Sequence, residues 1–250
     1  MLKHHEDSIK IMTEHYRENT EIIALFLVGS VATGTAREDS DLDGVAIVPQ
    51  EYFDRLQAAG GTMVIHHGKC TYEKGYFDIH FKTTTHLQQI LENGSEPMRN
   101  LFDCATPLFC NDDSLIDLVK QIPILPEGEI AAKQLRYYCT MKQSYRYYWN
   151  ICKPEGFHRH QIACAMVHCL YRLILLENRI LFPSLRKLED AIKKAPGKPD
   201  ALLEKCHTFL QNLTDDEANA LIQAYEGWTQ YAFPTEQRII ANNHREPWEW

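Results

Sequence analysis

The chain has 250 residues, of which 44% are hydrophobic and 24% are charged. This globular composition excludes a disordered chain, a collagen-like repeat and a coiled-coil array. The formal net charge is −8, and it is unevenly placed: residues 1–120 hold 10 Lys and Arg against 19 Asp and Glu, whereas residues 121–250 hold 16 against 15. This distribution disfavours a long nucleic-acid partner, which needs a basic surface, and favours a cationic small molecule or metal ions.

The sequence indicates a cytoplasmic protein. The opening segment, residues 1–7, is polar and lacks the apolar run of a signal peptide. No stretch approaches the roughly 18 apolar residues of a membrane span, so no membrane partner is expected. The eight cysteines form no Cys-x-x-Cys pair, and we expect buried free thiols without a disulfide or zinc site.

The first half of the chain mixes predicted helices with predicted strands. The apolar run at 22–28 ends at Gly29-Ser30 and favours a strand that is buried on both faces. A turn near residues 73–75 predicts a hairpin between two later strands. The expected strands are 22–28, 45–48, 62–70, 76–83 and 106–110, and the expected helices are 3–19, 51–59, 84–93 and 96–104.

The character of the sequence changes near Pro123–Pro126, beyond which only helical periods remain. Asp200 and Thr214 stand where helix N-caps are expected. The expected helices are 127–152, 158–178, 184–195, 199–212 and 215–231. We therefore predict an α+β protein, with an α/β domain with a mixed sheet at residues 1–122 and an all-α helical bundle at residues 123–250.

The chemically informative segment runs from the end of the first strand into the second. Gly29 allows the backbone to turn closely, and Ser30 offers a hydroxyl beside backbone amides that can bind phosphate. Asp41 and Asp43 lie two residues apart at a strand entrance, so both carboxylates are expected on one face. Two such carboxylates are costly unless a cation lies between them, and Mg²⁺ prefers oxygen ligands and phosphates.

A third carboxylate is predicted on a neighbouring strand. In the segment 76–81, Asp78 shares a face with Tyr76 and His80, while the alternate residues are apolar. Aspartate is a poor strand former, so its presence there indicates a metal or catalytic role. His80 is expected to be a hydrogen-bonding neighbour of Asp78, and Arg37 a surface residue in a salt bridge.

These residues resemble the signature of the DNA polymerase beta-like nucleotidyltransferase superfamily. The matching residues are Gly29-Ser30, Gly34 and Ser40-Asp41-Leu42-Asp43, with Asp78 at the third acidic position. The Ala32-Thr33-Gly34 variant and the helical second half resemble the aminoglycoside and lincosamide adenylyltransferase type. The resemblance implies a polymerase-beta-like fold for the first domain and a nucleotidyl transfer activity, of the kind that confers antibiotic resistance.

The resemblance also implies roles for individual residues. Asp41, Asp43 and Asp78 would hold two Mg²⁺ ions, with Asp78 as a third ligand or as the base. Gly29, Ser30 and Ser40 would bind ATP or another nucleoside triphosphate, and Lys187 is the candidate for a lysine that reaches the triphosphate. The acceptor would be a hydroxyl of a small molecule, and a homodimer is an open alternative to a monomer.

Two alternative functions remain at this point. The first is a nucleic-acid-directed nucleotidyltransferase, which the near-neutral second half disfavours. The second is a non-catalytic, antitoxin-like interaction protein fused to a helical ribonuclease-like half, for which Arg238 and His244 have the required spacing. With 5 His and 16 Lys and Arg beyond residue 120, such a spacing is common by chance, and it is weak evidence for a nuclease.

Overall fold

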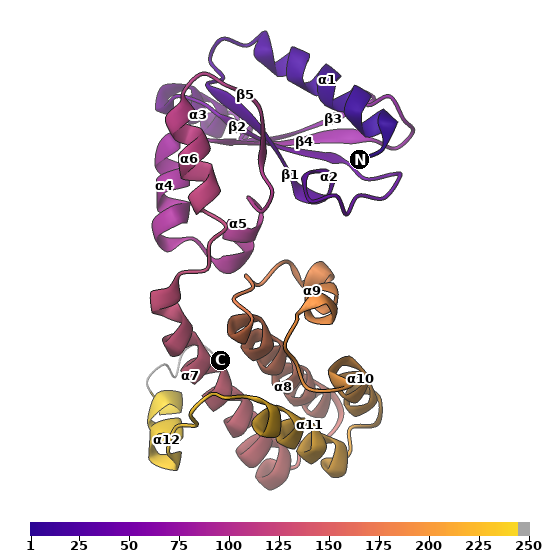
Figure 1. The fold of residues 1–250 in the computed structure, drawn as a ribbon, viewed down its shortest axis with the longest axis vertical. Coiled ribbons are helices and arrows are strands. Elements are labelled where there is room, and N and C mark those ends of the chain that lie inside the picture. Colours follow the sequence, from indigo (N-terminus) through magenta and orange to yellow (C-terminus); the bar gives the residue numbers. More distant parts are fainter. Residues whose placement is uncertain (245–250) are drawn as a thin grey trace. The chain divides into compact units, whose positions relative to one another are not determined.

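The computed structural model describes residues 1–244, which form two compact units (Figure 1). The first unit comprises Met1–Ile124, and the second begins at Leu125. The first unit contains a mixed sheet with helices, and the second is helical among its described residues. The α+β class predicted from the sequence is confirmed.

The sheet of the first unit has five strands in the order β3-β4-β2-β1-β5. β1 is antiparallel to both β2 and β5, β3 is antiparallel to β4, and β2 runs parallel to β4. The predicted hairpin is therefore present, and one parallel pair makes the sheet mixed. The strands are β1 (Ala24–Val28), β2 (Leu42–Ile47), β3 (Met63–His67), β4 (Tyr76–Lys82) and β5 (Thr106–Cys110).

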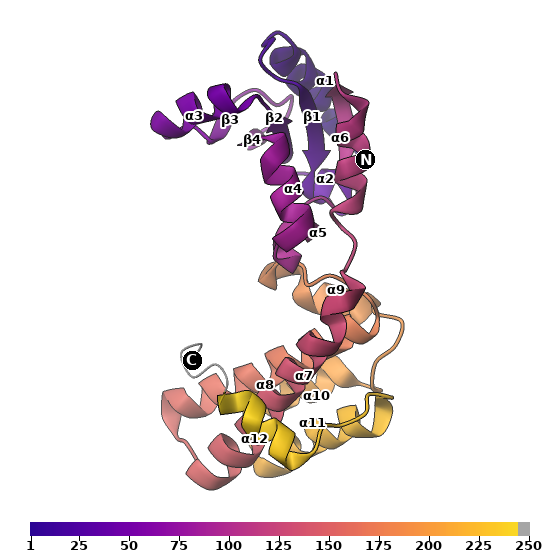
Figure 2. The ribbon, with the colours of Figure 1, turned by 90° about the vertical axis from the view of Figure 1, so that its left-hand side faces the viewer.

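Helices pack on both faces of this sheet. The helices of the first unit are α1 (Lys3–Arg17), α2 (Gly29–Ala32), α3 (Gln50–Ala58), α4 (Thr84–Asn93), α5 (Glu96–Asn100) and α6 (Asp113–Gln121). One core joins α1 and α3 to residues from all five strands. A second core joins α4 and α6, which lie side by side in Figures 1 and 2, to β1 and β2.

The second unit is built around the buried helix α8 (Gly156–Glu177). The other elements are α7 (Glu127–Gln143), the π-helical segment η1 (Ser144–Cys152), the 3-10 turn η2 (Leu185–Lys187), α9 (Leu188–Lys194), α10 (Leu202–Asn212), α11 (Asp215–Trp228) and α12 (Glu236–His244). Helices α6 and α12 were not predicted. The sequence does carry a signal for α6, because Leu115, Leu118 and Val119 follow helical spacing and the N-cap Asp112 accepts a hydrogen bond from Ser114 N–H.

The predicted helix 127–152 changes its winding at Ser144. An i→i+5 turn holds more residues than an α-helical turn, so the side chains of η1 do not continue the spacing of α7. Trp149 is fully buried, whereas Cys152, one of the cysteines expected to be buried, is exposed. Trp149 Nε1 donates a hydrogen bond to Asp215 Oδ1 at 2.9 Å, which connects η1 to the start of α11.

Three smaller predictions have mixed outcomes. Thr214 caps α11 and forms a capping box with Glu217, as predicted. Asp200 was wrongly predicted as an N-cap, because the residue before α10 is Ala201 in a left-handed conformation. The cysteines are free, as predicted, but Cys104, Cys152 and Cys164 are exposed rather than buried. Within the described residues, no helix combines the length and apolarity that crossing a membrane requires.

Candidate active site

Two neighbouring strands bring three carboxylates together at one end of the sheet. Asp43 in β2 stands directly opposite Asp78 in the parallel strand β4, and Asp41 immediately precedes β2. One oxygen from each of the three side chains lies within 4.8 Å of the others. We call Asp41, Asp43 and Asp78 the carboxylate cluster. The cluster lies on the sheet face that carries the α4 and α6 core, because Asp43 shares its face with Val45 and Ile47.

The turn from β1 into α2 touches the cluster. Val28, the last residue of β1, is paired with Asp43, and Gly29 follows with a φ of +73°. A Cβ atom at Gly29 would collide with the carboxylate of Asp43. The Thr33 hydroxyl donates to the carbonyls of Gly29 and Ser30, which holds this short turn in place. Gly29 and Ser30, the predicted phosphate-binding residues, are therefore beside Asp43.

A hydrogen-bonded loop presents Asp41. The Ser40 side chain is buried, and its hydroxyl accepts a hydrogen bond from Arg37 N–H at 2.9 Å. The Tyr72 hydroxyl donates to the carbonyl oxygen of Ser40. Ser40, predicted to bind nucleotide, is thus held from two sides directly before Asp41. Arg37 forms the predicted exposed salt bridge, here with Asp39.

Two side chains of β4, Tyr76 and His80, lie beside the carboxylate cluster. The pKa of Tyr76 is raised, first by its hydrogen bond to Asp41 and then by the nearby charges, which include Asp43 and Asp78. His80 Nε2 lies 3.4 Å from Asp78 Oδ1, so His80 is a neighbour of Asp78 as predicted, but the predicted hydrogen bond to this oxygen is not formed. Three acidic groups that raise the pKa of a tyrosine form a strongly negative site.

The residues of the cluster fit a divalent cation. Asp78 Oδ1 is buried and has no hydrogen-bond partner among the described residues. A buried carboxylate oxygen without a partner is costly, and a cation at this position would satisfy it. All three donors are carboxylates, the hard oxygen ligands that Mg²⁺ prefers. Asp41, Asp43 and Asp78 are therefore the residues that would hold the ion.

The other predicted residues belong to the second unit. Lys187 ends η2, and its role in nucleotide binding stays a prediction. Arg238 lies in α12, whose last residue is His244, and the His244 side chain lies outside the described part of the structure. A surface depression lined by Arg17, Phe109 and Asn111 contains none of the cluster residues.

Comparison with known proteins supports a nucleotidyl transfer activity. Residues 8–90 match the family model of the nucleotidyltransferase domain, which covers 83 of the 250 residues and includes the whole cluster. No curated protein matches the sequence. The structure is similar to that of a nucleotidyltransferase-like protein from Exiguobacterium sibiricum 255-15, with 13% identity over 96% of this chain and 86% of that one, at a TM-score of 0.39. The match and the cluster together define a nucleotidyl transfer enzyme domain.

Tyr72 is the residue near the site that sequence reasoning missed. It lies in the irregular segment between β3 and β4, where no periodic pattern assigns a direction to a side chain. Tyr76 was placed on the correct face by its period-two spacing, but its hydrogen bond to Asp41 depends on the loop that precedes β2. Neither contact has a signal in the spacing of the residues.

Proposed function

We propose that this protein transfers a nucleoside monophosphate, with AMP as the first candidate, from a nucleoside triphosphate to a hydroxyl group of a small molecule. The observation that carries the proposal is the carboxylate cluster, which lies beside Gly29 within the segment that matches the nucleotidyltransferase domain. In this proposal, residues 1–122 form the catalytic domain and residues 123–250 a helical domain.

Each residue near the cluster has a distinct task in the proposed reaction. Gly29 and Ser30 bind the β- and γ-phosphates, because a close backbone approach and free amides at a helix start suit phosphate. Asp41 and Asp43 hold Mg²⁺, with two ions expected, and Asp78 is a third ligand or the base. Bound Mg²⁺ supplies positive charge that neutralises the triphosphate oxygens. Ser40 positions Asp41, and Lys187 is proposed to reach the triphosphate.

The proposed step is a single in-line displacement. The oxygen of the acceptor hydroxyl bonds to the α-phosphorus, and the bond from that phosphorus to the bridging oxygen breaks. With Asp78 as the base, the hydroxyl proton passes to its carboxylate, and pyrophosphate leaves with the electron pair of the broken bond. Asp78 suits either task, ligand or base, because its buried Oδ1 has no hydrogen-bond partner among the described residues.

The proposal also specifies which class of molecule accepts the nucleotide. The resemblance to aminoglycoside and lincosamide adenylyltransferases favours an antibiotic-like alcohol, and modification of such a compound would confer resistance. A small molecule is favoured over nucleic acid because 16 Lys and Arg are balanced by 15 Asp and Glu in residues 121–250. A nucleic-acid partner would need a net basic surface.

The test measures magnesium-dependent nucleotide binding and pyrophosphate release. Purified protein should bind ATP in the presence of Mg²⁺, and a panel of nucleoside triphosphates and alcohols should identify a pair that releases pyrophosphate. Asp41→Asn should abolish both signals, because one ligand charge is removed without a change of shape. Asp117→Asn, on the exposed surface of α6, is the matched control. If the wild type binds no nucleotide and Asp41→Asn changes nothing, the proposal is wrong.

A further inference from the structure

One face of the sheet is only partly covered by helices. On the side of the carboxylate cluster, the core formed with α4 and α6 draws its strand residues from β1 and β2. On the opposite face, α1 and α3 pack against residues from all five strands. The described part of β3 and β4 on the cluster side therefore lies outside the α4 and α6 core.

The uncovered part carries a defined set of side chains. Met63 and Ile65 of β3 are 46% and 45% exposed, whereas Val64 between them packs on the opposite core. The strand register places Met63 opposite His80, Ile65 opposite Asp78, and His67 opposite Tyr76. We call Met63, Ile65, His67, Tyr76 and His80 the hairpin face.

The hairpin face is continuous with the carboxylate cluster. Side chains directly opposite on an antiparallel pair are close neighbours, so Ile65 lies next to Asp78. The strand order then gives a row across the sheet that runs Ile65, Asp78, Asp43 and Val28, with Gly29 directly after Val28. The phosphate-binding turn and the hairpin face thus lie on opposite sides of the cluster.

In-line displacement assigns the hairpin face to the acceptor. The attacking oxygen and the leaving pyrophosphate must lie on opposite sides of the α-phosphorus. In the proposed function, pyrophosphate leaves on the side of Gly29 and Ser30. The acceptor then enters from the side of Asp78 and Ile65, and the body of the acceptor lies over the hairpin face.

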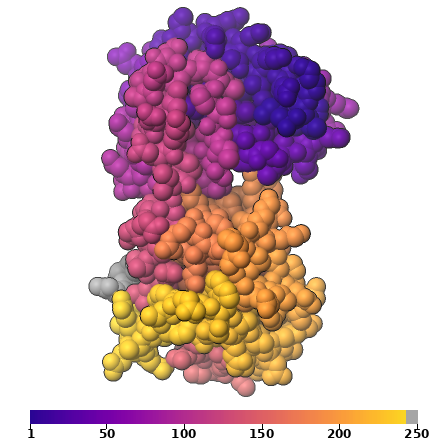
Figure 3. All heavy atoms as spheres, viewed as in Figure 1, coloured from indigo at the N-terminus to yellow at the C-terminus, as the bar shows by residue number. Residues whose placement is uncertain are grey.

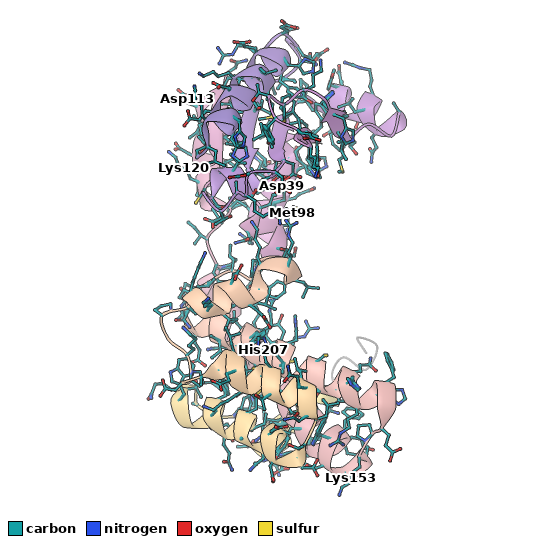
Figure 4. The ribbon with its side chains drawn as sticks, turned by 90° about the vertical axis from the view of Figure 1, so that its right-hand side faces the viewer. Asp39, Met98, Asp113, Lys120, Lys153 and His207 are labelled. Atoms are coloured by element: carbon teal, nitrogen blue, oxygen red, sulfur yellow. The ribbon has the colours of Figure 1, made fainter. Side chains whose placement is uncertain are left out.

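The charge distribution determines the chemistry of this acceptor. The five strands contain no acidic residue other than Asp43 and Asp78, which belong to the cluster. The remaining acidic residues of the first unit lie on helices and in loops, such as Asp113 at the start of α6 and Asp39 in the loop before β2 (Figure 4). Apart from Asp78, the strands of the hairpin face therefore carry no acidic side chain, and Lys82 follows His80 on the same face of β4.

We infer that the acceptor is an alcohol with an uncharged apolar or aromatic face, which packs on Met63 and Ile65 while its hydroxyl group lies at Asp78. This inference rests on the proposed function and narrows it. Exposed aliphatic side chains gain from apolar contact, whereas a polycation finds no acidic partner on these strands beyond Asp78 of the cluster. His67, Tyr76 and His80 add ring faces and polar edges, which suit an aromatic ligand that also carries hydroxyl groups.

The test compares three glycosides that carry hydroxyl groups and differ in charge and apolar surface. The probes are 4-nitrophenyl β-D-glucopyranoside, methyl β-D-glucopyranoside and kanamycin, and their dissociation constants are measured by titration of the full chain in the presence of Mg²⁺. The aryl glucoside should bind about fivefold more tightly than the methyl glucoside, because the aryl group buries additional apolar surface. Kanamycin should bind no more tightly than the methyl glucoside. Preferential binding of kanamycin would overturn the inference.

Variants locate the binding surface. Ile65→Thr keeps a β-branched side chain in the strand, and it should remove the preference for the aryl glucoside. Ile11→Thr, at the 37% exposed Ile11 on α1, is the matched control and should retain the preference. An unchanged preference in Ile65→Thr would overturn the inference. Binding of ATP with Mg²⁺ is measured on the same samples: its absence in the wild type contradicts the proposed function, whereas its presence without an aryl preference contradicts only the inference.

Discussion

Gly29 connects the backbone geometry of the site with its chemistry. Its φ of +73° is in the left-handed region, and its Cα faces the carboxylate of Asp43 so closely that no side chain fits between them. We expect Gly29→Ala to abolish magnesium-dependent ATP binding, because the added methyl group must displace Asp43. Isothermal titration with ATP and Mg²⁺ would measure this loss.

A control separates the collision from the backbone strain. Gly60 has a φ of +70°, and a Cβ there meets no atom within 4 Å. Gly60→Ala should therefore cost about 1 kcal/mol of unfolding free energy, as an alanine in this conformation does, and should leave ATP binding intact. Equal loss of ATP binding in both variants would show that strain, rather than contact with Asp43, is responsible.

At the residue scale, the sequence predicted the side-chain positions that follow from strand periodicity, and it missed a contact that joins two loops. The period of two along a strand placed Asp78 and His80 on one face, and the structure shows this arrangement. The separation of Asp41 and Asp43 was likewise sufficient to predict their proximity. Tyr72 could not be predicted, because its contact with Ser40 joins two irregular segments that are 32 residues apart.

At the scale of elements, the segment that contains Tyr72 joins α1 to the loop before β2. Thr71 donates two hydrogen bonds to α1, from its backbone N–H to Ser8 Oγ and from its hydroxyl to the carbonyl oxygen of His4. The centroid of the Tyr72 ring lies 4.5 Å from that of the His4 ring. The Tyr72 hydroxyl then donates to Ser40. The start of α1 therefore supports the loop that presents Asp41 to the cluster.

These contacts predict that Tyr72 positions Asp41 through its hydrogen bond to Ser40. Tyr72→Phe keeps the ring contacts and removes the hydrogen bond to Ser40, so Asp41 should be held less firmly. We expect magnesium affinity to fall roughly tenfold, as is common when a residue that orients a ligand is changed. Calorimetric titration of Mg²⁺ in the presence of ATP would measure the change.

Tyr52→Phe provides the matched control for that experiment. Tyr52 lies on α3, and its hydroxyl accepts a hydrogen bond from the Asn19 side chain at 2.9 Å. Its ring packs against the core of α1 and α3, not at the cluster. Its removal should cost about 1 kcal/mol of stability and should not change magnesium affinity. A similar loss of affinity in both variants would contradict the positioning role of Tyr72.

The change of winding at η1 has a physical cause that the sequence does not show. Hydrophobic spacing identified α7 and α8, but it assumes 3.6 residues per turn and cannot detect the wider turn of η1. The wider turn is accompanied by contacts of Trp149 with Phe209 of α10 and Asp215 of α11. Tertiary contacts of this kind are absent from any local window of the sequence.

The same contacts predict the cost of changing Trp149. Trp149→Phe removes the hydrogen bond to Asp215 and leaves a space beside Phe209, and Arg159 loses the indole ring over which it lies at 3.9 Å. We expect a loss of about 2 kcal/mol in unfolding free energy. Urea denaturation would measure it, with Tyr147→Phe at an exposed position of η1 as the control. An unchanged midpoint in Trp149→Phe would contradict this prediction.

At the scale of the whole molecule, composition and charge predicted the class of the protein better than its ligand. The change of pattern near residue 123 and the absence of later strand signals were sufficient for the α+β class. The acidic first half suggested a cationic acceptor, but its charge lies outside the strands, except at the cluster. In the space-filling view, α1 and α6 form part of the surface of the first unit, and both carry acidic side chains (Figure 3). Net charge therefore could not identify the surface that faces a ligand.

Four histidines that are buried or partly buried give the molecule a dependence on pH that net charge alone does not predict. Burial lowers the pKa of His5, His66 and His86 in the first unit and of His168 in the second. His5 is fully buried, and neither of its ring nitrogens has a hydrogen-bond partner among the described residues. Such a ring is held neutral in the folded state, because a buried charge without a partner is costly.

Acidification should therefore destabilise the protein through these groups. Below pH 6.5, the ordinary pKa of histidine, the unfolded chain binds protons that folded His5 does not, so the free energy of unfolding falls as the pH is lowered. The stability that neutral His5 contributes is fully present above pH 6.5, and it decreases by at most about 1.4 kcal/mol per pH unit until the folded pKa is reached. Urea denaturation between pH 7.5 and 5 would measure the slope.

A pair of variants assigns that slope to a single residue. His5→Leu removes the titrating group, so its unfolding free energy should fall less steeply between pH 6.5 and 5 than that of the wild type, whatever the change in absolute stability. His158→Leu, at an exposed position on α8, should retain the slope of the wild type. His5 also contacts the ring of Tyr72, whose hydroxyl donates to Ser40. If His5→Leu and the wild type lose stability in parallel, the acid sensitivity arises elsewhere, and the partly buried His66, His86 and His168 are the groups to change next.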